Sequence, residues 1–348
     1  MKRIASKFLA VTALSLASMA PAAAETLSVV GSWSNLPLHQ QFEAPFWTKT
    51  LPAADSAIEV QLTTHNQMGI QGGDVFRMLG DGVFDVGMTV GDYAVGDAPE
   101  LEGLDVPLIA TTTDEAKAMV EAARPMVDDI FAQRFNAKVL AIAPYPPQVV
   151  FCKGDVASLA DLKGKKIRGS GRMTTKFLEA LGAEGVNVAF SEVPGALERS
   201  VIDCAVTGSG SGYSAGWWEV TDTLMTLPLG GWDPVVTAIN MDKWNSLSEE
   251  MRSLIATEVA AKFEAPAWAS AAASMSTDTA CLTGNGECPA GNPASMKLVE
   301  ASEADITTAR KILTETVLPE WAERAGPDWV KRWNDSVGKT TGVTVATN

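Results

Sequence analysis

Histidine is scarce in this chain, and its scarcity limits the catalytic and metal-binding sites that the chain could hold. Only two histidines, His39 and His65, occur among 348 residues. Neither belongs to an H-x-x-x-H or HExxH pattern, and no Gly-x-Ser-x-Gly segment occurs, so the usual signatures of zinc and serine hydrolases are missing. We therefore predict no metal and no cofactor. His65 follows a strand-like run and could border a cleft, although a position at the surface is the plainer expectation.

Long apolar segments are absent as well. No run after residue 24 reaches the roughly 18 uninterrupted apolar residues that a membrane span requires. The first 24 residues have a basic head, an apolar core from Phe8 to Met19, and small residues at 21–24, which together are typical of a secretory signal peptide. We predict cleavage after Ala24 and export to the periplasm. A retained anchor is the alternative, and lipid attachment is disfavoured because no cysteine follows.

Basic residues are few compared with acidic ones. The chain has 27 Lys and Arg against 42 Asp and Glu, a net charge of −15. Residues 1–24 contain three basic and no acidic residues, so their removal gives 24 − 42 = −18. Such an acidic surface repels nucleic acids and anionic lipids, which argues against both as partners. The net charge does not identify a ligand, because local groups govern a buried site.

Four cysteines are present, and none has the C-x-x-C spacing of a redox or zinc site. In an oxidising compartment, Cys281 and Cys288 are expected to close a small loop whose turn is supplied by glycines. Closing about eight residues would stabilise the fold by roughly 2.5 kcal/mol. Cys152 and Cys204 remain, and both lie near the ends of strand-like runs. We expect them to form the second disulfide.

Strand-like and helical segments alternate along the chain, which predicts an α/β fold with parallel sheet covered by helices on both faces. The 348 − 24 = 324 residues after the signal segment are too many for one ordinary core, so two domains are expected. The strand-like runs are Thr26–Val30, Ile58–Thr63, Val83–Val90, Val139–Ala143, Lys166–Gly169, Val186–Ala189, Ile202–Val206 and Val235–Asn240, and the helical patterns are Gly73–Leu79, Thr113–Arg134, Thr174–Leu181 and Val193–Arg199. From Leu247 onward the pattern is mainly helical.

Two segments of the chain resemble each other. Residues 79–89 match residues 197–207 at a constant offset, with Leu, Val, Asp and Thr at equivalent places. Each segment reads as a helix, a tight turn and a buried strand. Because ligands of open α/β sheets bind beyond the carboxyl ends of strands, two such lobes facing each other would form a cleft.

Arg168 is the first candidate for binding an anion in that cleft. It ends a strand-like run and precedes Gly169-Ser170-Gly171, so its side chain can reach the edge of the sheet. A guanidinium presents a rigid fork of donors that matches a carboxylate. The alternative is a solvated charge, as we expect for the neighbouring lysines. Arg172 is a rival cation that the pattern leaves open.

A glycine-rich segment, Ala205–Gly212, follows another strand-like run and includes Thr207 and Gly208. Such a loop can direct backbone N–H groups toward an anion, although a flexible turn is the plainer interpretation. It is not a P-loop, because no Gly-Lys-Ser or Gly-Lys-Thr follows.

Several aromatic residues also follow strand-like runs at the proposed cleft. Aromatic walls suit a ligand with an apolar or ring-shaped body, although core packing explains most aromatic residues. The candidates for the cleft are Trp33, Tyr93, Tyr145, Phe190 and Trp232, whereas Trp217, Trp218, Trp244 and Trp321 are assigned to the core.

The chain resembles the solute-binding receptors of TRAP transporters, the DctP-type family, in a series of short motifs. The family pattern runs "DLKG-x-K-[IL]-R", "LGA", "SEV-x-x-AL" and "[VI]DG". Its counterparts here are Asp161–Arg168, Leu181–Ala183, Ser191–Leu197 and Ile202–Asp203, with Cys204 replacing the last glycine. Residues 240–247 are similar to a later pattern, "N-x-x-x-W-x-x-L".

This resemblance implies a ligand site. In the family, the arginine at position 168 pairs with a ligand carboxylate, and the positions of Trp33 and Phe190 line the pocket. An asparagine usually occupies the place of Thr207, so the polar contacts should differ here. Members that bind longer acids carry a second cation where this chain has Gln148, which makes a second ligand carboxylate less expected.

The combined prediction is an exported, monomeric receptor of two-lobe, periplasmic-binding-protein-like fold with a helical C-terminal region. Lobe I would contain residues 25–145 and 233–272, and lobe II residues 146–232 and 273–348, with crossings near Tyr145 and Trp232. The receptor would bind a small carboxylate and deliver it to the small and large TRAP membrane subunits, without catalysis. A secreted hydrolase with a carboxylate pair and a receptor for an ABC importer are the alternatives.

Overall fold

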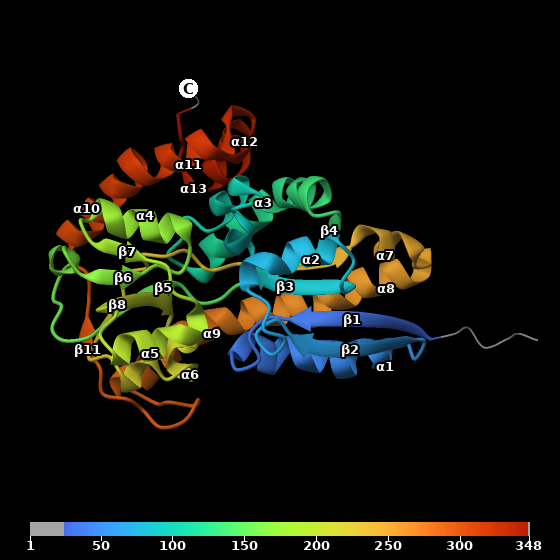
Figure 1. Ribbon diagram of the computed structural model, residues 1–348, viewed down its shortest axis with the longest axis horizontal. Coiled ribbons are helices and arrows are strands. Elements are labelled where there is room, and N and C mark those ends of the chain that lie inside the picture. The colour runs from blue at the N-terminus through green and yellow to red at the C-terminus, as the bar shows by residue number, and fades with distance from the viewer. Residues whose placement is uncertain (1–23, 347–348) are drawn as a thin grey trace, which may run out of the picture.

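The computed structural model describes residues 24–346, and within that range the strands form two separate sheets. Apart from Ala24, the predicted signal peptide lies outside the described residues. Each sheet is flanked by helices, and we call the five-stranded sheet with its helices the first lobe and the six-stranded sheet with its helices the second lobe. Figure 1 shows the first lobe mainly in blue and cyan and the second mainly in green and yellow, with later segments of the chain, in orange, added to each. The predicted two-lobe α/β fold is confirmed.

The first sheet has the strand order β2-β1-β3-β10-β4. Its strands are β1 (Glu25–Gly31), β2 (Ile58–Thr64), β3 (Val86–Val90), β4 (Ala137–Ala143) and β10 (Val235–Asn240). Every residue of β3 and β10 is buried. Continuous apolar strands of this kind are expected at the centre of a sheet that is covered on both faces.

The second sheet has the order β11-β9-β5-β8-β6-β7. Its strands are β5 (Gln148–Cys152), β6 (Lys166–Arg168), β7 (Glu184–Val186), β8 (Cys204–Gly208), β9 (Thr223–Met225) and β11 (Lys297–Val299). Strands β5, β9 and β11 were not predicted, and β7 ends where the predicted strand Val186–Ala189 begins. β9 and β11 have three residues each, which is too short for a hydrophobic period to be recognised.

The prediction of parallel sheets is wrong for one strand in each lobe. β10 is antiparallel to both β3 and β4, and β5 is antiparallel to both β8 and β9. These are the strands that the chain enters directly after it crosses between the lobes, at residues 144–147 and 226–234. The chain therefore enters β5 and β10 from the side of the cleft. The carboxyl ends of the other strands meet at that same side, where ligands bind in open α/β sheets.

Helices cover both sheets and join the lobes (Figure 1). None of the helices in residues 24–346 combines the length and apolar composition needed to cross a bilayer.

The α-helices are α1 (Leu51–Ala54), α2 (Val75–Gly80), α3 (Thr113–Arg134), α4 (Arg172–Ala180), α5 (Val193–Glu198), α6 (Ser209–Ser214), α7 (Met241–Ser246), α8 (Glu249–Val259), α9 (Ala265–Thr283), α10 (Glu303–Ile312), α11 (Leu318–Ala325), α12 (Pro327–Trp333) and α13 (Lys339–Thr341).

Helix α9 contacts both lobes, because it continues α8 through a π-helical turn at Ala260–Glu264. Near its start, the indole N–H of Trp268 donates to the carbonyl of Ile142 in the first lobe, at 3.0 Å. Toward its end, Asp278 accepts from the hydroxyl of Ser209 in the second lobe, at 3.4 Å. The helix is thus a third connection beside the two crossings near Tyr145 and Trp232.

The C-terminal helices contact both lobes. Residues 273–348 were predicted to belong to the second lobe alone. The indole N–H of Trp321 donates to Pro99 at 3.1 Å in the first lobe. On the other side, Asp305 of α10 accepts from the backbone N–H of Leu159 at 3.0 Å. Figure 1 shows these helices, in red, lying over α3 and α4.

The two matching segments of the sequence occupy equivalent places in the two lobes. The carboxylate of Asp85 accepts a hydrogen bond from the backbone N–H of Ser28 in β1, next to the point where β1 pairs with β3. In the same way, the carboxylate of Asp203 accepts from the backbone N–H of Lys166 in β6. The turns before them contain Gly82 and Ser200, both with positive φ. Each aspartate therefore ties a tight turn to the neighbouring strand, which explains why the aspartate recurs in both segments.

Both predicted disulfides are confirmed. Cys152 and Cys204 face each other on β5 and β8, and their bond closes a segment with a sequence separation of 52 residues. Cys281 and Cys288 close a loop with a separation of 7 residues at the end of α9. No cysteine is free in the described part of the chain.

Candidate functional site

A cavity of about 760 Å³ lies between the lobes. Its walls come from segments that follow β1, β2 and β3 in the first lobe and β6 and β7 in the second. This volume is within the range of roughly 300–1,000 Å³ that is usual for small-molecule sites. The cavity therefore lies where the carboxyl ends of strands from both sheets meet.

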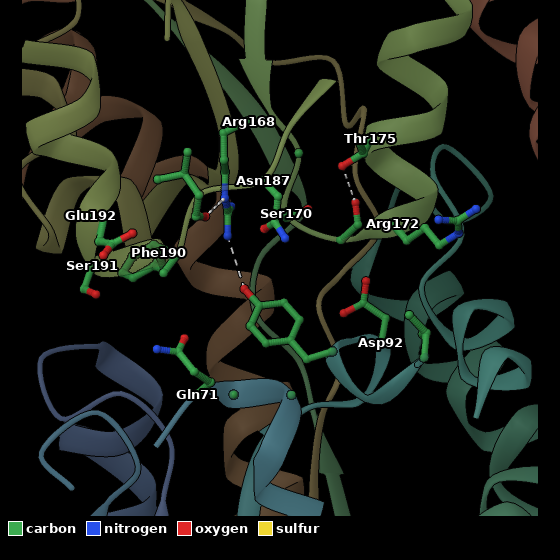
Figure 2. Close-up of a pocket in the computed structure, with 18 of the residues that line it drawn as sticks. Gln71, Asp92, Arg168, Ser170, Arg172, Thr175, Asn187, Phe190, Ser191 and Glu192 are labelled. Atoms are coloured by element: carbon green, nitrogen blue, oxygen red, sulfur yellow. Dashed lines mark hydrogen bonds between the residues drawn. The ribbon is translucent and has the colours of Figure 1, made fainter. Parts of the chain in front are cut away.

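Arg168 ends β6 and reaches this cavity, with only 3% of the residue exposed. Its Nε donates to the carbonyl of Val188 at 3.2 Å, and Nη1 donates to the carbonyl of Val206 at 2.8 Å. Nη2 donates to the hydroxyl of Tyr93 at 3.2 Å, across the cleft. In Figure 2, a dashed line from the guanidinium of Arg168 marks this bond across the cleft. The two carbonyls hold the guanidinium in one orientation.

The guanidinium of Arg168 has no carboxylate within ion-pair distance among residues 24–346. A guanidinium has five N–H donors, and the three bonds above leave two of them free. A buried charge without a partner is costly, so a site of this kind favours an anion. Two donors on one rigid fork match the two oxygens of a carboxylate.

Arg172, the rival cation, also lines the cavity but has partners of its own. Its Nη2 lies 3.1 Å from Glu320 and its Nε lies 3.8 Å from Glu102. Its side chain is 42% exposed, which weakens its field by solvent screening. The charge of Arg172 is therefore compensated inside the protein, whereas that of Arg168 is left for a ligand.

Tyr93 follows β3, and its hydroxyl oxygen accepts from Arg168. Because that oxygen already accepts, its proton is directed elsewhere and can be donated to a bound anion. Burial raises the pKa of Tyr93 to about 12, although the neighbouring Arg168 opposes the shift. The hydroxyl stays protonated near neutral pH, and it can act as a donor beside the guanidinium.

We predict that Tyr93→Phe weakens carboxylate binding by about 5- to 30-fold, the equivalent of about 1–2 kcal/mol for one lost hydrogen bond. Calorimetry with the tightest acid from a ligand screen would measure the change. The thermal unfolding of the ligand-free variant should remain close to that of the wild type. Equal dissociation constants for the two proteins would contradict a donor role for Tyr93.

Aromatic side chains form the wall beside Arg168. The ring of Trp33 lies edge-on to Tyr93, Tyr145 and Phe190, with centroids 5.8–6.3 Å apart. A second, much smaller cavity of about 10 Å³ is lined by these four residues together with Arg168 and Thr207. The structure thus brings together six of the predicted residues, and it places Thr207 in the deeper part of the site.

Three predicted residues do not line either cavity. Trp232 is buried, and its indole N–H donates to Ala110 at 3.0 Å, so it packs in the interior instead of facing the cleft. Gln148 is fully buried and donates to Pro146 at 3.2 Å. Gly208 packs against both Pro146 and Gln148. Each of the three residues lies in a crossing segment or packs against one, which indicates a role in shaping the junction between the lobes.

The cavity also contains polar residues that the sequence did not single out, among them Gln71, Asp92, Ser170 and Asn187 (Figure 2), and His65 borders it as well. The expectation of a surface position for His65 is wrong, because the residue is 2% exposed and lines the cavity, as the alternative had it; His39 is 8% exposed. His39 bonds to Glu43 at 2.8 Å. The only available signal was position, since His65 and Asp92 each follow a strand.

Three buried aspartates gather beside the cavity. Asp92, Asp105 and Asp233 are 2–6% exposed, and their carboxylate oxygens lie within 4.8 Å of one another. Within the described residues, they are the group with the donor set to hold a cation. Burial raises the pKa of Asp92 and Asp233, and repulsion by the neighbouring carboxylates adds to the rise. Burial also raises the pKa of Asp105, to about 6. The carboxyl groups therefore favour shared protons over three full charges.

The lobes approach each other closely at Gly171, just before α4. A methyl group there would lie 1.7 Å from the Oδ2 of Asp92 in the other lobe. The backbone of Gly171 is extended, so other residues could adopt its conformation without strain. The glycine is therefore required by the contact between the lobes.

We predict that Gly171→Ala hinders closure and weakens ligand binding by about tenfold, because the added methyl must displace a buried carboxylate. Small-angle scattering should show a larger radius of gyration for the liganded variant than for the liganded wild type. Gly96→Ala is the matched control, since a methyl at Gly96 meets nothing within 4 Å. A variant that closes like the control would contradict this prediction.

Comparison with known proteins identifies the family. The family model described as "bacterial extracellular solute-binding protein, family 7" (DctP) matches residues 34–315. Because this match covers most of the chain, the protein belongs to that family. The predicted resemblance is confirmed.

Solved structures of similar fold come from several organisms. The Bordetella pertussis extracytoplasmic solute receptor DctP7, which binds pyroglutamic acid, is 22% identical with a TM-score of 0.80, over 90% of this chain and 99% of that one. A TRAP solute-binding protein from Desulfovibrio salexigens with bound orotic acid is 16% identical, with a TM-score of 0.79, over 90% and 99%. A marine metagenome protein specific for aromatic acids, with 3-hydroxybenzoate, is 24% identical with a TM-score of 0.75, over 91% and 99%.

Proposed function

We propose that this protein is the solute receptor of a TRAP transporter and that it binds a small organic acid between its lobes. The observation that carries the proposal is the guanidinium of Arg168, which is 97% buried, has two free N–H donors and faces a cavity between two lobes. A ligand carboxylate would complete the bonding of this group. Tyr93 would add a donor from the opposite lobe, so that the ligand favours closure.

The receptor would hold the acid and release it unchanged to the small and large membrane subunits. In support, the similar receptors are described with pyroglutamate, orotate and 3-hydroxybenzoate, all of which are carboxylates. Trp33, Phe190 and Tyr145 would enclose the organic part of the ligand, and Thr207 would contribute a polar contact in the deeper part of the site. We propose that the protein acts as a monomer. We also propose that the chain passes from one lobe to the other near residues 145, 232 and 272.

We propose that the receptor is located in the periplasm after its signal peptide has been cleaved between Ala24 and Glu25. The family name supports a place outside the cytoplasm. Mass spectrometry of the exported protein would test the cleavage site, since the mature chain should begin at Glu25.

A thermal-shift screen with a library of carboxylic acids tests the proposed function. A binding acid present at 100 times its dissociation constant stabilises the folded protein by roughly 2.7 kcal/mol, which is readily detected. The acid should be recovered chemically unchanged after prolonged incubation. If no carboxylic acid raised the melting temperature, the receptor function would be wrong, and turnover of the acid would favour the alternative of a secreted hydrolase.

A further inference from the structure

The second lobe covers a buried acidic group of the first lobe at Asp92. A Cβ atom on Gly171 would stand 1.7 Å from the Oδ2 of Asp92, so the backbone before α4 rests directly on this carboxyl. Figure 2 shows Asp92 facing the start of α4, which carries Arg172 and Thr175. Separation of the lobes would remove this cover and expose the carboxyl to water.

The group around Asp92 is rich in acceptors and short of donors. Asp105 and Asp233 are its other members, and all three residues are more than nine-tenths buried. Each has one buried oxygen without a hydrogen-bond partner among residues 24–346, namely the Oδ1 of Asp92, the Oδ2 of Asp105 and the Oδ1 of Asp233. The other oxygen of Asp105 accepts from two backbone N–H groups, at 2.6 and 2.8 Å. Protons on the carboxyl groups would supply the missing donors.

The first-lobe groups that face Asp92 do not balance a negative charge there. Glu102 is itself acidic and raises the pKa of Asp92 by repulsion, and its own ion pair is with Arg324 of α11. Tyr93 and Tyr145 lie beside the group as well. Burial raises the pKa of both phenols, that of Tyr93 to about 12, so they remain neutral.

The second lobe brings two cations near the group, and neither forms an ion pair with Asp92. Arg172 lies 3.8 Å from Glu102 and 3.1 Å from Glu320. The charge of Arg168 favours the ionised form of Asp92 and so opposes the rise of its pKa. A ligand carboxylate on Arg168 would neutralise that charge. Binding of an anion therefore removes the main opposition to a proton on Asp92.

The direction of the pH dependence follows from the cover over Asp92. Burial, followed by repulsion from Asp105 and Glu102, raises the pKa of Asp92 well above its usual range. In an open cleft the pKa of this carboxyl would return to the ordinary value of about 4. The closed form then binds one proton more than the open form above that pH, at least up to about 6, the pKa of Asp105 in the same group. Closure is therefore strongest at low pH and weakens as the pH rises toward the raised pKa.

We propose that the receptor takes up a proton when it closes on an organic acid, and that Asp92, with Asp105 and Asp233, holds this proton under Gly171. The proton comes from solvent and returns to it when the lobes separate, so the site gains a carboxylate and a proton together. This inference rests on the proposed function, since it assumes that Arg168 binds a carboxylate and that the lobes close. It adds a form of regulation, in which acidity favours loading of the receptor.

Calorimetry in two buffers of different ionisation enthalpy, MES and imidazole, counts the protons taken up on binding. The probes are pyroglutamate and 3-hydroxybenzoate, or the tightest acid of the thermal-shift screen if neither binds, with EDTA present. At about pH 6, the wild type should take up about one proton more per ligand than Asp92→Asn. The comparison with this variant cancels the contribution of His65, whose pKa burial lowers and which would release a proton on closure.

The pH profile of affinity separates proton uptake from a merely structural role. In the wild type, affinity should fall by up to about tenfold for each rise of one pH unit within the range of uptake. Asp92→Asn has nearly the same size and cannot ionise, so it should lose this dependence and bind at least as tightly as the wild type above the range. Asp97→Asn, at an exposed carboxyl 3.7 Å from Arg77, is the matched control and should keep the uptake of the wild type.

The outcomes distinguish this inference from the proposed function. If an acid binds and the wild type takes up no more protons than Asp92→Asn, the inference is overturned and the receptor function stands. Weaker binding by Asp92→Asn at every pH also overturns it, as does an affinity that depends on added calcium and not on pH. If no carboxylic acid binds, the receptor function fails, and the inference fails with it.

Discussion

Arg168→Ala is expected to weaken binding of the organic acid by roughly two to three and a half decades in dissociation constant. The ligand carboxylate would remain buried in the closed cleft without its partner, which costs roughly 3–5 kcal/mol. Because Val188 and Val206 would also lose their donors, the conformation around the cavity would be less well defined. Calorimetry with the tightest acid from the screen measures the loss directly.

Two further variants make the result specific. Arg168→Lys keeps the charge but not the fork, so its affinity should fall between those of the wild type and Arg168→Ala. Arg172→Ala should change affinity by less than about tenfold, because Arg172 is half exposed and already paired with Glu320. If Arg172→Ala proved the more damaging change, Arg172 would replace Arg168 as the anion partner.

The second large effect concerns stability. Replacement of both Cys152 and Cys204 by alanine is expected to lower the free energy of unfolding by about 4 kcal/mol, since the bond closes 52 residues in the unfolded chain. The bond between Cys281 and Cys288 closes only 7 residues, so its removal should cost about 2.5 kcal/mol. Urea unfolding followed by circular dichroism would compare the two variants. Equal losses, or a larger loss for the shorter loop, would contradict the loop-length argument.

Arg168, the proposed anion partner, could be singled out from the sequence because its place at the end of a strand is a local property. Arg168 ends a strand and precedes two glycines, and both properties are visible in the sequence. The two disulfides could be predicted from the compartment and from elimination. The tight turns before Asp85 and Asp203 were visible as a repeated segment, although their equivalence became clear only from the hydrogen bonds to Ser28 and Lys166.

The remaining parts of the site depend on contacts between distant segments. Asp92 is one of 42 acidic residues, and nothing in its neighbourhood in the sequence shows that Gly171 of the other lobe will cover it. Trp232 was expected in the cleft because it lies in a crossing segment, but its indole finds an acceptor at Ala110, 122 residues away. Strand β5 was missed because it follows a crossing that ends with two prolines, Pro146 and Pro147, and because the other strands of its sheet come later in the chain.

The position of β10 has a consequence for how the molecule is made. β10 separates β3 from β4, and neither of these strands pairs with the other. A ribosome must therefore complete residue 240 before the amino-terminal half can finish its own sheet, although that half has been synthesised up to β4 long before. Five of the six strands of the second sheet, β5 to β9, are synthesised between these two events. A nascent chain halted after β4 would expose two unpaired strand edges, so the protein assembles as a whole and not one half at a time.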